Sequence, residues 1–231
     1  MEPTISQVNR AGRVLRNWAA YAAAGKLDEL TGALEVLAAF RSAHAQPLAK
    51  ASSGLRSMLR SESCPVEVSQ RLKRSATIID KLSRQPTMAL SRMQDIGGCR
   101  AVVQDLAELR RVEKRIRANR PPVHVTDYVE NPKASGYRGV HLIVTYDDRQ
   151  IEIQLRTQLM HQWAVAVERY GGKLGEDLKS GSGPAEVLDW LRSVSAAVEM
   201  EERGQQVDVT LKGQVSYLRQ AALPQFSEEN P

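Results

Sequence analysis

Apolar residues recur with the period of an α-helix along the first part of the chain. Three segments, 6–24, 28–45 and 48–60, each gather their apolar residues toward one side, as amphipathic helices do. We expect these helices to form a layer that covers one face of a sheet. Trp18 and Phe40 are large and apolar, so we expect both in the core of this layer.

A second pattern, alternation of apolar and polar residues, lies in the middle of the chain. Residues 151–156 alternate at every position, which is the period of a half-buried strand. Residues 137–145 form another run of β character, and the two runs meet at 147–150, so a hairpin is predicted. Its polar face gathers Tyr137, His141, Glu152, Gln154 and Arg156. Such a row suits a nucleotide, but a strand at a sheet edge also shows polar residues to water without any chemical role.

The remaining segments mix helical and β patterns. We expect helices at 65–84, 105–119, 157–170 and 185–202. Strands are expected at 99–103 and 123–129. Gly171 and Gly172 are expected to end the helix that begins at 157. A Gly/Ser-rich loop at 180–184 precedes the last helix, and the polar segment 204–231 is expected to be a mobile tail.

Two of these predicted helices carry basic stripes. On 65–84 the stripe lies opposite an apolar face and contains Arg71, Lys73, Arg74, Thr77, Lys81 and Arg84. On 105–119 the basic residues are Arg110, Arg111, Lys114, Arg115 and Arg117. A solvated face is the usual explanation of such stripes. The second stripe is also a candidate surface for the backbone of RNA.

Composition narrows the partners and the compartment. The chain has 231 residues, a formal net charge of +5 and a pI near 9.3, which favours anionic partners such as nucleoside triphosphates or nucleic acid. Cys64 and Cys99 have neither the spacing of a metal site nor that of a disulfide framework, so a reducing cytoplasm is expected. Cys99 is expected to be a small core residue and not a nucleophile. The sequence has no signal peptide or membrane-spanning run, so we expect a cytoplasmic protein without a membrane partner.

Three strings of sequence, taken together, resemble one protein family. They are DIGGCR at 95–100, PKASGYRGVH at 132–141 and EIQLRTQLMHQWA at 152–164. In order, spacing and residue type they resemble the synthetase domain of the RelA/SpoT family, the pyrophosphokinases that make the alarmones ppGpp and pppGpp. The resemblance covers about residues 71–169 and implies an α+β fold, a mixed β-sheet flanked by helices and related to the nucleotidyltransferases. It implies N-terminal helices at 1–63, a synthetase domain at 64–203 and a tail at 204–231.

The resemblance also implies a reaction and roles for individual residues. The β,γ-pyrophosphate of ATP moves to the 3′-hydroxyl of an acceptor nucleotide, and AMP leaves. Asp95 is implied to hold Mg²⁺, and Glu152 to act as the general base or as a second metal ligand, two roles that the sequence does not separate. The residues implied to bind ATP are Arg71, Lys73, Thr77, Lys81 and Arg100. Those implied to bind the acceptor are Lys133, Tyr137, His141, Gln154 and Arg156, with Tyr137 as a stacking face.

Departures from the family pattern fall around the acceptor. Many alarmone synthetases have Asn at the place of Ser135 and Ser at the place of Gly139, and the string WAVAVERYGG from Trp163 is closer to divergent, toxin-like branches.

Three hypotheses about the function follow. ATP and GDP or GTP are the substrates in the first, and tRNA 3′-CCA or an adenine nucleotide is the acceptor in the second. The third is an inactive nucleotide- or RNA-binding module. A homo-oligomer and a neutralising antitoxin stay open as partners.

Overall fold

The computed structural model describes residues 2–64 and 66–226 of the chain. Its strands are β1 (Val68–Leu72), β2 (Gly97–Val103), β3 (His124–Asp127), β4 (Val140–Tyr146) and β5 (Arg149–Thr157). The helices in the N-terminal half are α1 (Ile5–Arg16), α2 (Trp18–Ala23), α3 (Leu27–Ser42), α4 (Ala45–Ser61), α5 (Ser75–Arg84) and α6 (Leu106–Asn119). Those in the C-terminal half are α7 (Gln158–Leu174), α8 (Ala185–Glu202) and α9 (Val209–Ala222).

The strands form one mixed sheet in the order β1-β2-β5-β4-β3. Strands β2 and β5 run parallel, and the other neighbours run antiparallel. The predicted hairpin of β4 and β5 is confirmed, with Asp147 and Asp148 at positive φ in its two-residue turn. Because β5 alternates, Ile151 and Ile153 are buried on one face while Glu152 and Gln154 lie on the other. The predicted α+β fold with a mixed sheet is thus confirmed.

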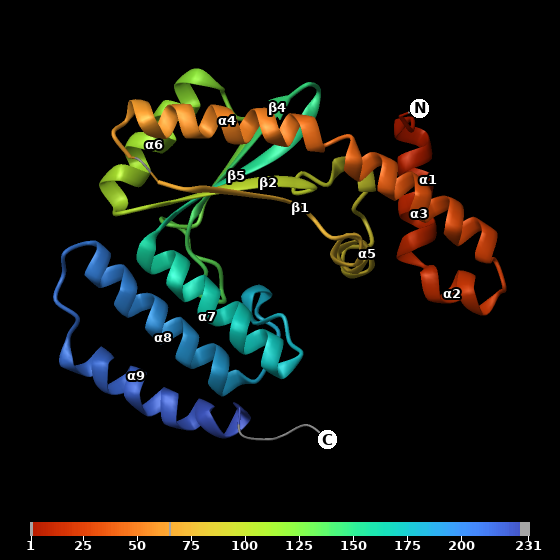
Figure 1. Ribbon diagram of the computed structural model, residues 1–231. Helices are drawn as coiled ribbons and strands as arrows, with labels where there is room; N and C mark the ends of the chain where they lie inside the picture. The colour runs from red at the N-terminus through yellow and green to blue at the C-terminus, as the bar shows by residue number, and fades with distance from the viewer. Residues whose placement is uncertain (1, 65, 227–231) are drawn as a thin grey trace.

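Helices cover the two faces of the sheet unequally. In Figure 1, α4 and α6 lie along one side of the sheet, and α7, α8 and α9 lie on the other. The first face is closed by an apolar core in which Leu55 of α4 and Val112 of α6 pack with the strands. On the other side, α7 and α8 form a second cluster around Trp163. Part of the sheet on that side is left without an apolar cover.

The three N-terminal helices do not form the expected layer over the sheet. Helix α4 packs on the strands, whereas α1 and α3 pack with α5 into a separate cluster around Leu37 and Phe40 at one side of the molecule (Figure 1). Phe40 is buried as predicted. Trp18 is 54% exposed, because the helix expected at 6–24 is interrupted at Asn17 and the short α2 buries none of its residues. The prediction for Trp18 was wrong.

The segment expected as a helix at 65–84 contains a strand and a helix in its described part. Residues 68–72 pair antiparallel with β2, and the Lys73 N–H donates to the Ile96 carbonyl at 2.8 Å. The sheet therefore satisfies the backbone groups that a helix would otherwise satisfy internally. Pro65 lies outside the described residues.

Two expectations about the C-terminal part are also corrected. Helix α7 continues past Gly171 to Leu174 and ends at Gly175 in the left-handed conformation. A Cβ at Gly171 would lie 2.6 Å from the Glu176 carbonyl oxygen, so glycine there permits the chain to fold back closely. The expected tail from residue 204 contains α9, which packs on α8 and buries Ala222, while 227–231 lie outside the described residues. Among the described helices, none has the length and apolar character that a membrane span requires.

Candidate active site

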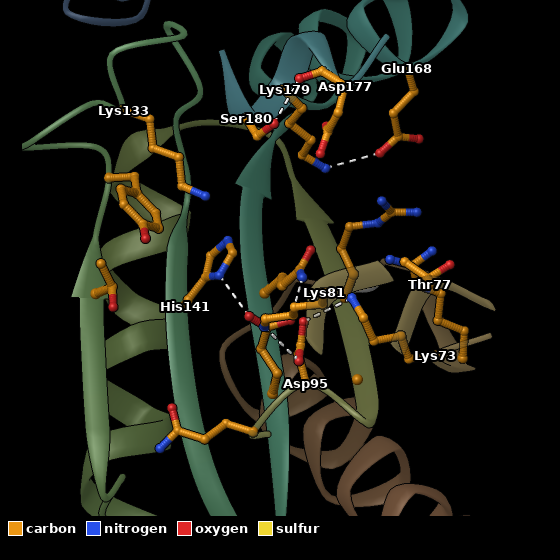
Figure 2. A pocket seen from close by; sticks show the side chains of 18 of the residues that line it. Lys73, Thr77, Lys81, Asp95, Lys133, His141, Glu168, Asp177, Lys179 and Ser180 are labelled. Carbon is orange, nitrogen blue, oxygen red and sulfur yellow. Dashed lines mark hydrogen bonds and ion pairs between the residues drawn. The ribbon is translucent and has the colours of Figure 1, made fainter. Parts of the chain in front are cut away.

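A cavity of about 1080 Å³ lies over the face of the sheet that α4 and α6 leave open. Its walls come from β1, α5, β2, β3, β4, β5, α7 and the turn after α7, which includes the 3₁₀ helix η2 (Leu178–Ser180). Figure 2 shows Asp95, Lys73 and Lys81 at one end of it, and Glu168 and Lys179 at the other. The predicted site residues that line it are Arg71, Lys73, Thr77, Lys81, Asp95, Arg100, Lys133, His141, Glu152, Gln154 and Arg156. Segments far apart in the sequence thus converge on one cavity.

At one end, Asp95 is held between two lysines. Its Oδ2 accepts from Lys73 Nζ and its Oδ1 from Lys81 Nζ, both at 3.0 Å. Lys73 follows β1 and Lys81 lies on α5, while Asp95 lies just before β2. Burial would raise the pKa of the Asp95 carboxyl, but the charges of Lys73 and Lys81 lower it by more. Asp95 is therefore ionised at neutral pH, and its charge is balanced by groups that can also meet phosphate.

Glu152 belongs to a closed ring of hydrogen bonds. Its Oε1 contacts His141 Nδ1 at 2.8 Å, and its Oε2 accepts from Gln154 Nε2 at 2.6 Å. Gln154 Oε1 accepts from Arg156 Nη2 at 3.2 Å, and Arg156 Nε donates to the Tyr137 hydroxyl at 3.2 Å. That hydroxyl closes the ring with His141 Nε2 at 2.6 Å. The strand register brings these side chains together, because His141 pairs with Gln154 across β4 and β5.

The donors and acceptors in this ring of hydrogen bonds indicate which atoms carry hydrogens. Arg156 can only donate, so the Tyr137 hydroxyl accepts from it and has its own hydrogen free to donate to His141 Nε2. The other ring nitrogen, Nδ1, then carries the hydrogen that points at Glu152. Burial would raise the pKa of Glu152, but its contacts with His141 and with the Gln154 amide lower it by more. Glu152 is thus an oriented, ionised carboxylate.

Tyr137 does not offer the open stacking face that was predicted. It precedes β4, its side chain is 0% exposed, and its hydroxyl is engaged in the ring. Gly139 has a φ of +150°, and a Cβ there would lie 3.2 Å from the Tyr137 hydroxyl, so glycine lets the chain turn Tyr137 back under the site. The aromatic residue that lines the cavity is Tyr128, whose ring meets that of Tyr137 edge to face at 5.6 Å.

The cavity wall between these groups is strongly basic. Arg100 Nε and Arg156 Nη1 are buried and have no hydrogen-bond partner. Burial, and then the charge of Arg156, lower the pKa of Arg100. Buried guanidinium nitrogens without partners are costly, which indicates that an anion accepts from them.

Tyr128, Glu168 and Lys179 also line the cavity, although no sequence pattern predicted a role for them. Tyr128 follows β3 and Glu168 lies on α7, where no residue pattern separates a cavity residue from a solvated one. Lys179 belongs to η2, in a loop whose composition predicts only flexibility. None of the three carries a signal that sequence patterns could have detected.

Helix α6, the candidate RNA surface, packs on the opposite face of the sheet and contributes no residue to the cavity. Its arginines also have acidic partners. Arg110 pairs with Glu113, Asp127 and Glu130, and Arg117 pairs with Glu113. Arg111 and Arg115 lie within 4 Å of Glu108 and Glu62, respectively. Much of the basic charge that the sequence shows on this helix is therefore neutralised.

The carboxylates fit a divalent cation only in part. Among residues 2–64 and 66–226, no group of three or more His, Cys, Asp or Glu side chains could hold a metal ion. Asp95 and Glu152 are two carboxylates that line the same cavity. Mg²⁺ commonly binds through one or two carboxylates together with water and substrate phosphates. Two carboxylates fit a Mg²⁺ ion that binds together with a nucleotide.

Comparisons with known proteins show which family the chain resembles in sequence. Residues 70–170 match the family model described as "Region found in RelA / SpoT proteins". GTP pyrophosphokinase YjbM of Bacillus subtilis (strain 168) is 33% identical over 132 residues, which cover 50% of this chain and 63% of YjbM. GTP pyrophosphokinase of Escherichia coli (strain K12) is 31% identical over 163 residues, 67% of this chain and 22% of that protein. The chain thus spans less than two thirds of the length of these curated relatives.

Solved structures give the same result for the fold. The crystal structure of small alarmone synthetase 1 from Bacillus subtilis bound to its product pppGpp superposes with a TM-score of 0.59 and 27% identity, covering 70% of this chain and 90% of that one. A GTP pyrophosphokinase family protein from Streptococcus pneumoniae gives a TM-score of 0.57 and 26% identity, covering 75% of this chain and 93% of that one. The match to the family model includes the cavity residues from Arg71 to Glu168.

Proposed function

The chain belongs to the RelA/SpoT family, and we propose that it is a pyrophosphokinase that transfers the β,γ-pyrophosphate of ATP to the 3′-hydroxyl of GDP or GTP. One observation carries this proposal. Two ionised carboxylates, Asp95 and Glu152, lie with Lys73 and Lys81 in one cavity that also presents unpartnered arginine nitrogens. Charge neutralisation and a base in one place are what pyrophosphate transfer requires.

The basic side chains bind and orient the donor. Lys73 and Lys81 are point charges suited to the phosphate chain of ATP, and Arg71 and Arg100 present planar guanidinium groups from neighbouring positions on β1 and β2. Thr77 adds a hydroxyl on α5. With the negative charge of the transferred group balanced, the β-phosphorus of ATP becomes open to attack by the acceptor oxygen.

Glu152 takes the proton of the acceptor. The 3′-oxygen forms a bond to the β-phosphorus, the bond from that phosphorus to the oxygen bridging to the α-phosphate breaks, and AMP leaves. The proton of the 3′-hydroxyl passes to the Glu152 carboxylate, which His141 and Gln154 hold in one orientation. Asp95 and Glu152 are the residues that would hold Mg²⁺, which supplies positive charge to the transferred phosphates.

The experiment is a transfer assay with purified protein. ATP labelled with ³²P at the γ-phosphate is incubated with Mg²⁺ and, separately, with GDP, GTP, ADP, ATP and deacylated tRNA. Label on GDP or GTP is the expected result, and Glu152→Gln is expected to lower the rate by about 10² to 10⁴, the usual contribution of a general base. Label on tRNA or adenine nucleotides alone would refute the assignment of the acceptor. No transfer to any acceptor would refute the enzyme assignment.

A further inference from the structure

The segment that follows the family-matched residues 70–170 forms part of the cavity wall. After α7 the chain turns at Gly175 and passes through η2, which places Lys179 in the cavity. The Lys179 side chain is 29% exposed, and its Nζ lies 2.9 Å from Glu168 Oε1. It also lies 5.1 Å from the centre of the Tyr137 ring. This lysine therefore reaches the acceptor side of the site from outside the matched region.

Hydrogen bonds fix η2 to the loop that carries the acceptor residues. Ser135 Oγ donates to the Lys179 carbonyl at 2.9 Å. Ser135 is buried, and it stands where many alarmone synthetases have Asn. The same loop is held from α8, because Ser195 Oγ donates to the Gly136 carbonyl at 2.6 Å. The departure at Ser135 thus has a structural consequence, which is to position the backbone of Lys179.

Lys133 and Lys179 share one aromatic ring. Lys133 Nζ lies 5.3 Å from the centre of the Tyr137 ring and 4.8 Å from that of Tyr128. Burial lowers the pKa of both lysines, and Arg156 lowers both further. Lys179 has Glu168 as its acidic partner, whereas among the described residues Lys133 forms no ion pair with a carboxylate. Two ammonium groups therefore lie against the same ring, and only that of Lys179 has a direct acidic partner among the described residues.

We propose that Lys179 binds the phosphate chain of the acceptor nucleotide together with Lys133, and so helps to select the acceptor. This inference rests on the proposed pyrophosphate transfer. A compact ammonium group suits a phosphate chain better than a base edge, and two of them suit a di- or triphosphate better than a monophosphate. Glu168 holds Lys179 until the acceptor binds, and its carboxylate competes with phosphate for the same ammonium group.

The test compares three single variants in steady-state assays with GDP, GTP and ATP. Lys179→Met is expected to raise KM for GDP and GTP by about tenfold, the value of a charge-assisted contact. Its kcat and its KM for ATP are expected to stay within about twofold. Glu168→Gln is expected to leave KM for GDP and GTP unchanged or lower it, because a competing carboxylate is removed. Lys173→Met, which removes an exposed lysine of α7 outside the cavity, serves as the matched control.

Several results would overturn the inference. Lys179 would be merely a structural partner of Glu168 if Lys179→Met and Glu168→Gln raised KM alike. A rise in KM for ATP alone would place Lys179 at the ATP-binding part of the cavity. An equal rise in KM for Lys173→Met would show that the effect comes from the net charge of the protein and not from a contact of Lys179. Binding of a fluorescent GDP analogue separates the two proposals. Lys179-dependent binding without any transfer supports this inference while refuting the proposed function, and absence of binding by the unaltered protein refutes both.

Discussion

Replacing Glu202 by Ala is expected to destabilise the protein strongly, although the residue lies at the end of α8 and outside the cavity. Glu202 forms an ion pair with Arg138 and accepts a hydrogen bond from the Thr157 hydroxyl. The side chains of Arg138 and Glu202 are only 2% and 4% exposed. The pair joins α8 both to the loop before β4 and to the start of α7.

The magnitude follows from what the substitution leaves behind. Arg138 would stay buried without an acidic partner, and two of its nitrogens already have no hydrogen-bond partner. Removing one member of a buried pair typically costs about 3–5 kcal/mol. The Thr157 hydroxyl would still accept from the Met160 N–H but would lose the acceptor for its own hydrogen, which adds about 1–3 kcal/mol. A domain has about 5–15 kcal/mol in total, so the loss is a large fraction of its stability.

Urea unfolding followed by tryptophan fluorescence measures this. Trp163 is buried beside α8 and donates to the Leu191 carbonyl at 2.9 Å, so it reports on the affected helices. The matched control is Glu199→Ala, on the same helix, whose partner Arg203 is 41% exposed, and it is expected to cost less than about 1 kcal/mol. The double variant Arg138→Met with Glu202→Leu is expected to recover most of the loss. Equal costs for Glu202→Ala and Glu199→Ala would refute this reasoning.

Three further predictions concern the site and its surroundings. His141→Asn keeps an amide donor near the position of Nδ1 and is expected to retain most of kcat in the transfer assay. His141→Gln removes the group that donates to Glu152 and is expected to lower kcat by about 10- to 100-fold. Equal kcat values for the two variants would contradict the ring. Cys99 is expected to resist iodoacetamide at pH 8 until urea unfolds the protein, because burial raises the pKa of its thiol to about 12 and so keeps it protonated; rapid alkylation of Cys99 in the folded protein, read by peptide mass spectrometry, would refute this. Arg111→Glu with Arg115→Glu is expected to leave transfer to GDP unchanged, because α6 lies on the far face of the sheet, and a tenfold loss of that activity would contradict the placement.

Local patterns predicted the sheet hairpin and most helices, because in those segments the side-chain period and the burial agree. Strand β5 alternates and is half-buried, and α6 begins at Leu106, directly after its capping residue Asp105. The spacing of apolar residues gave a wrong prediction where pairing with a distant strand determines the structure. Residues 68–72 read as helical because apolar Leu72 continues the stripe of α5, yet their backbone pairs with β2. No local signal shows that an edge strand has a partner.

The resemblance brought together residues that no local pattern could join, but it did not predict how they face. Lys73 and Lys81 were expected on one helical face, and they meet at Asp95 from a strand end and a helix. Tyr137 was expected to be open, and it is buried because Gly139 turns the chain and two lysines and Arg156 lie against its ring. Such features depend on backbone conformation and on segments outside the motif.

The two ends of the cavity therefore differ in how far family similarity can describe them. At one end, Asp95 and the two lysines that contact it all lie within 70–170. The other end depends on η2 and α8, which follow that range and hold the acceptor loop through Ser135, Ser195 and Glu202. A change in η2 or α8 would move Lys179 or the loop between β3 and β4, while Asp95 would keep its contacts with Lys73 and Lys81. The acceptor therefore has to be measured on this chain and cannot be carried over from relatives that share residues 70–170.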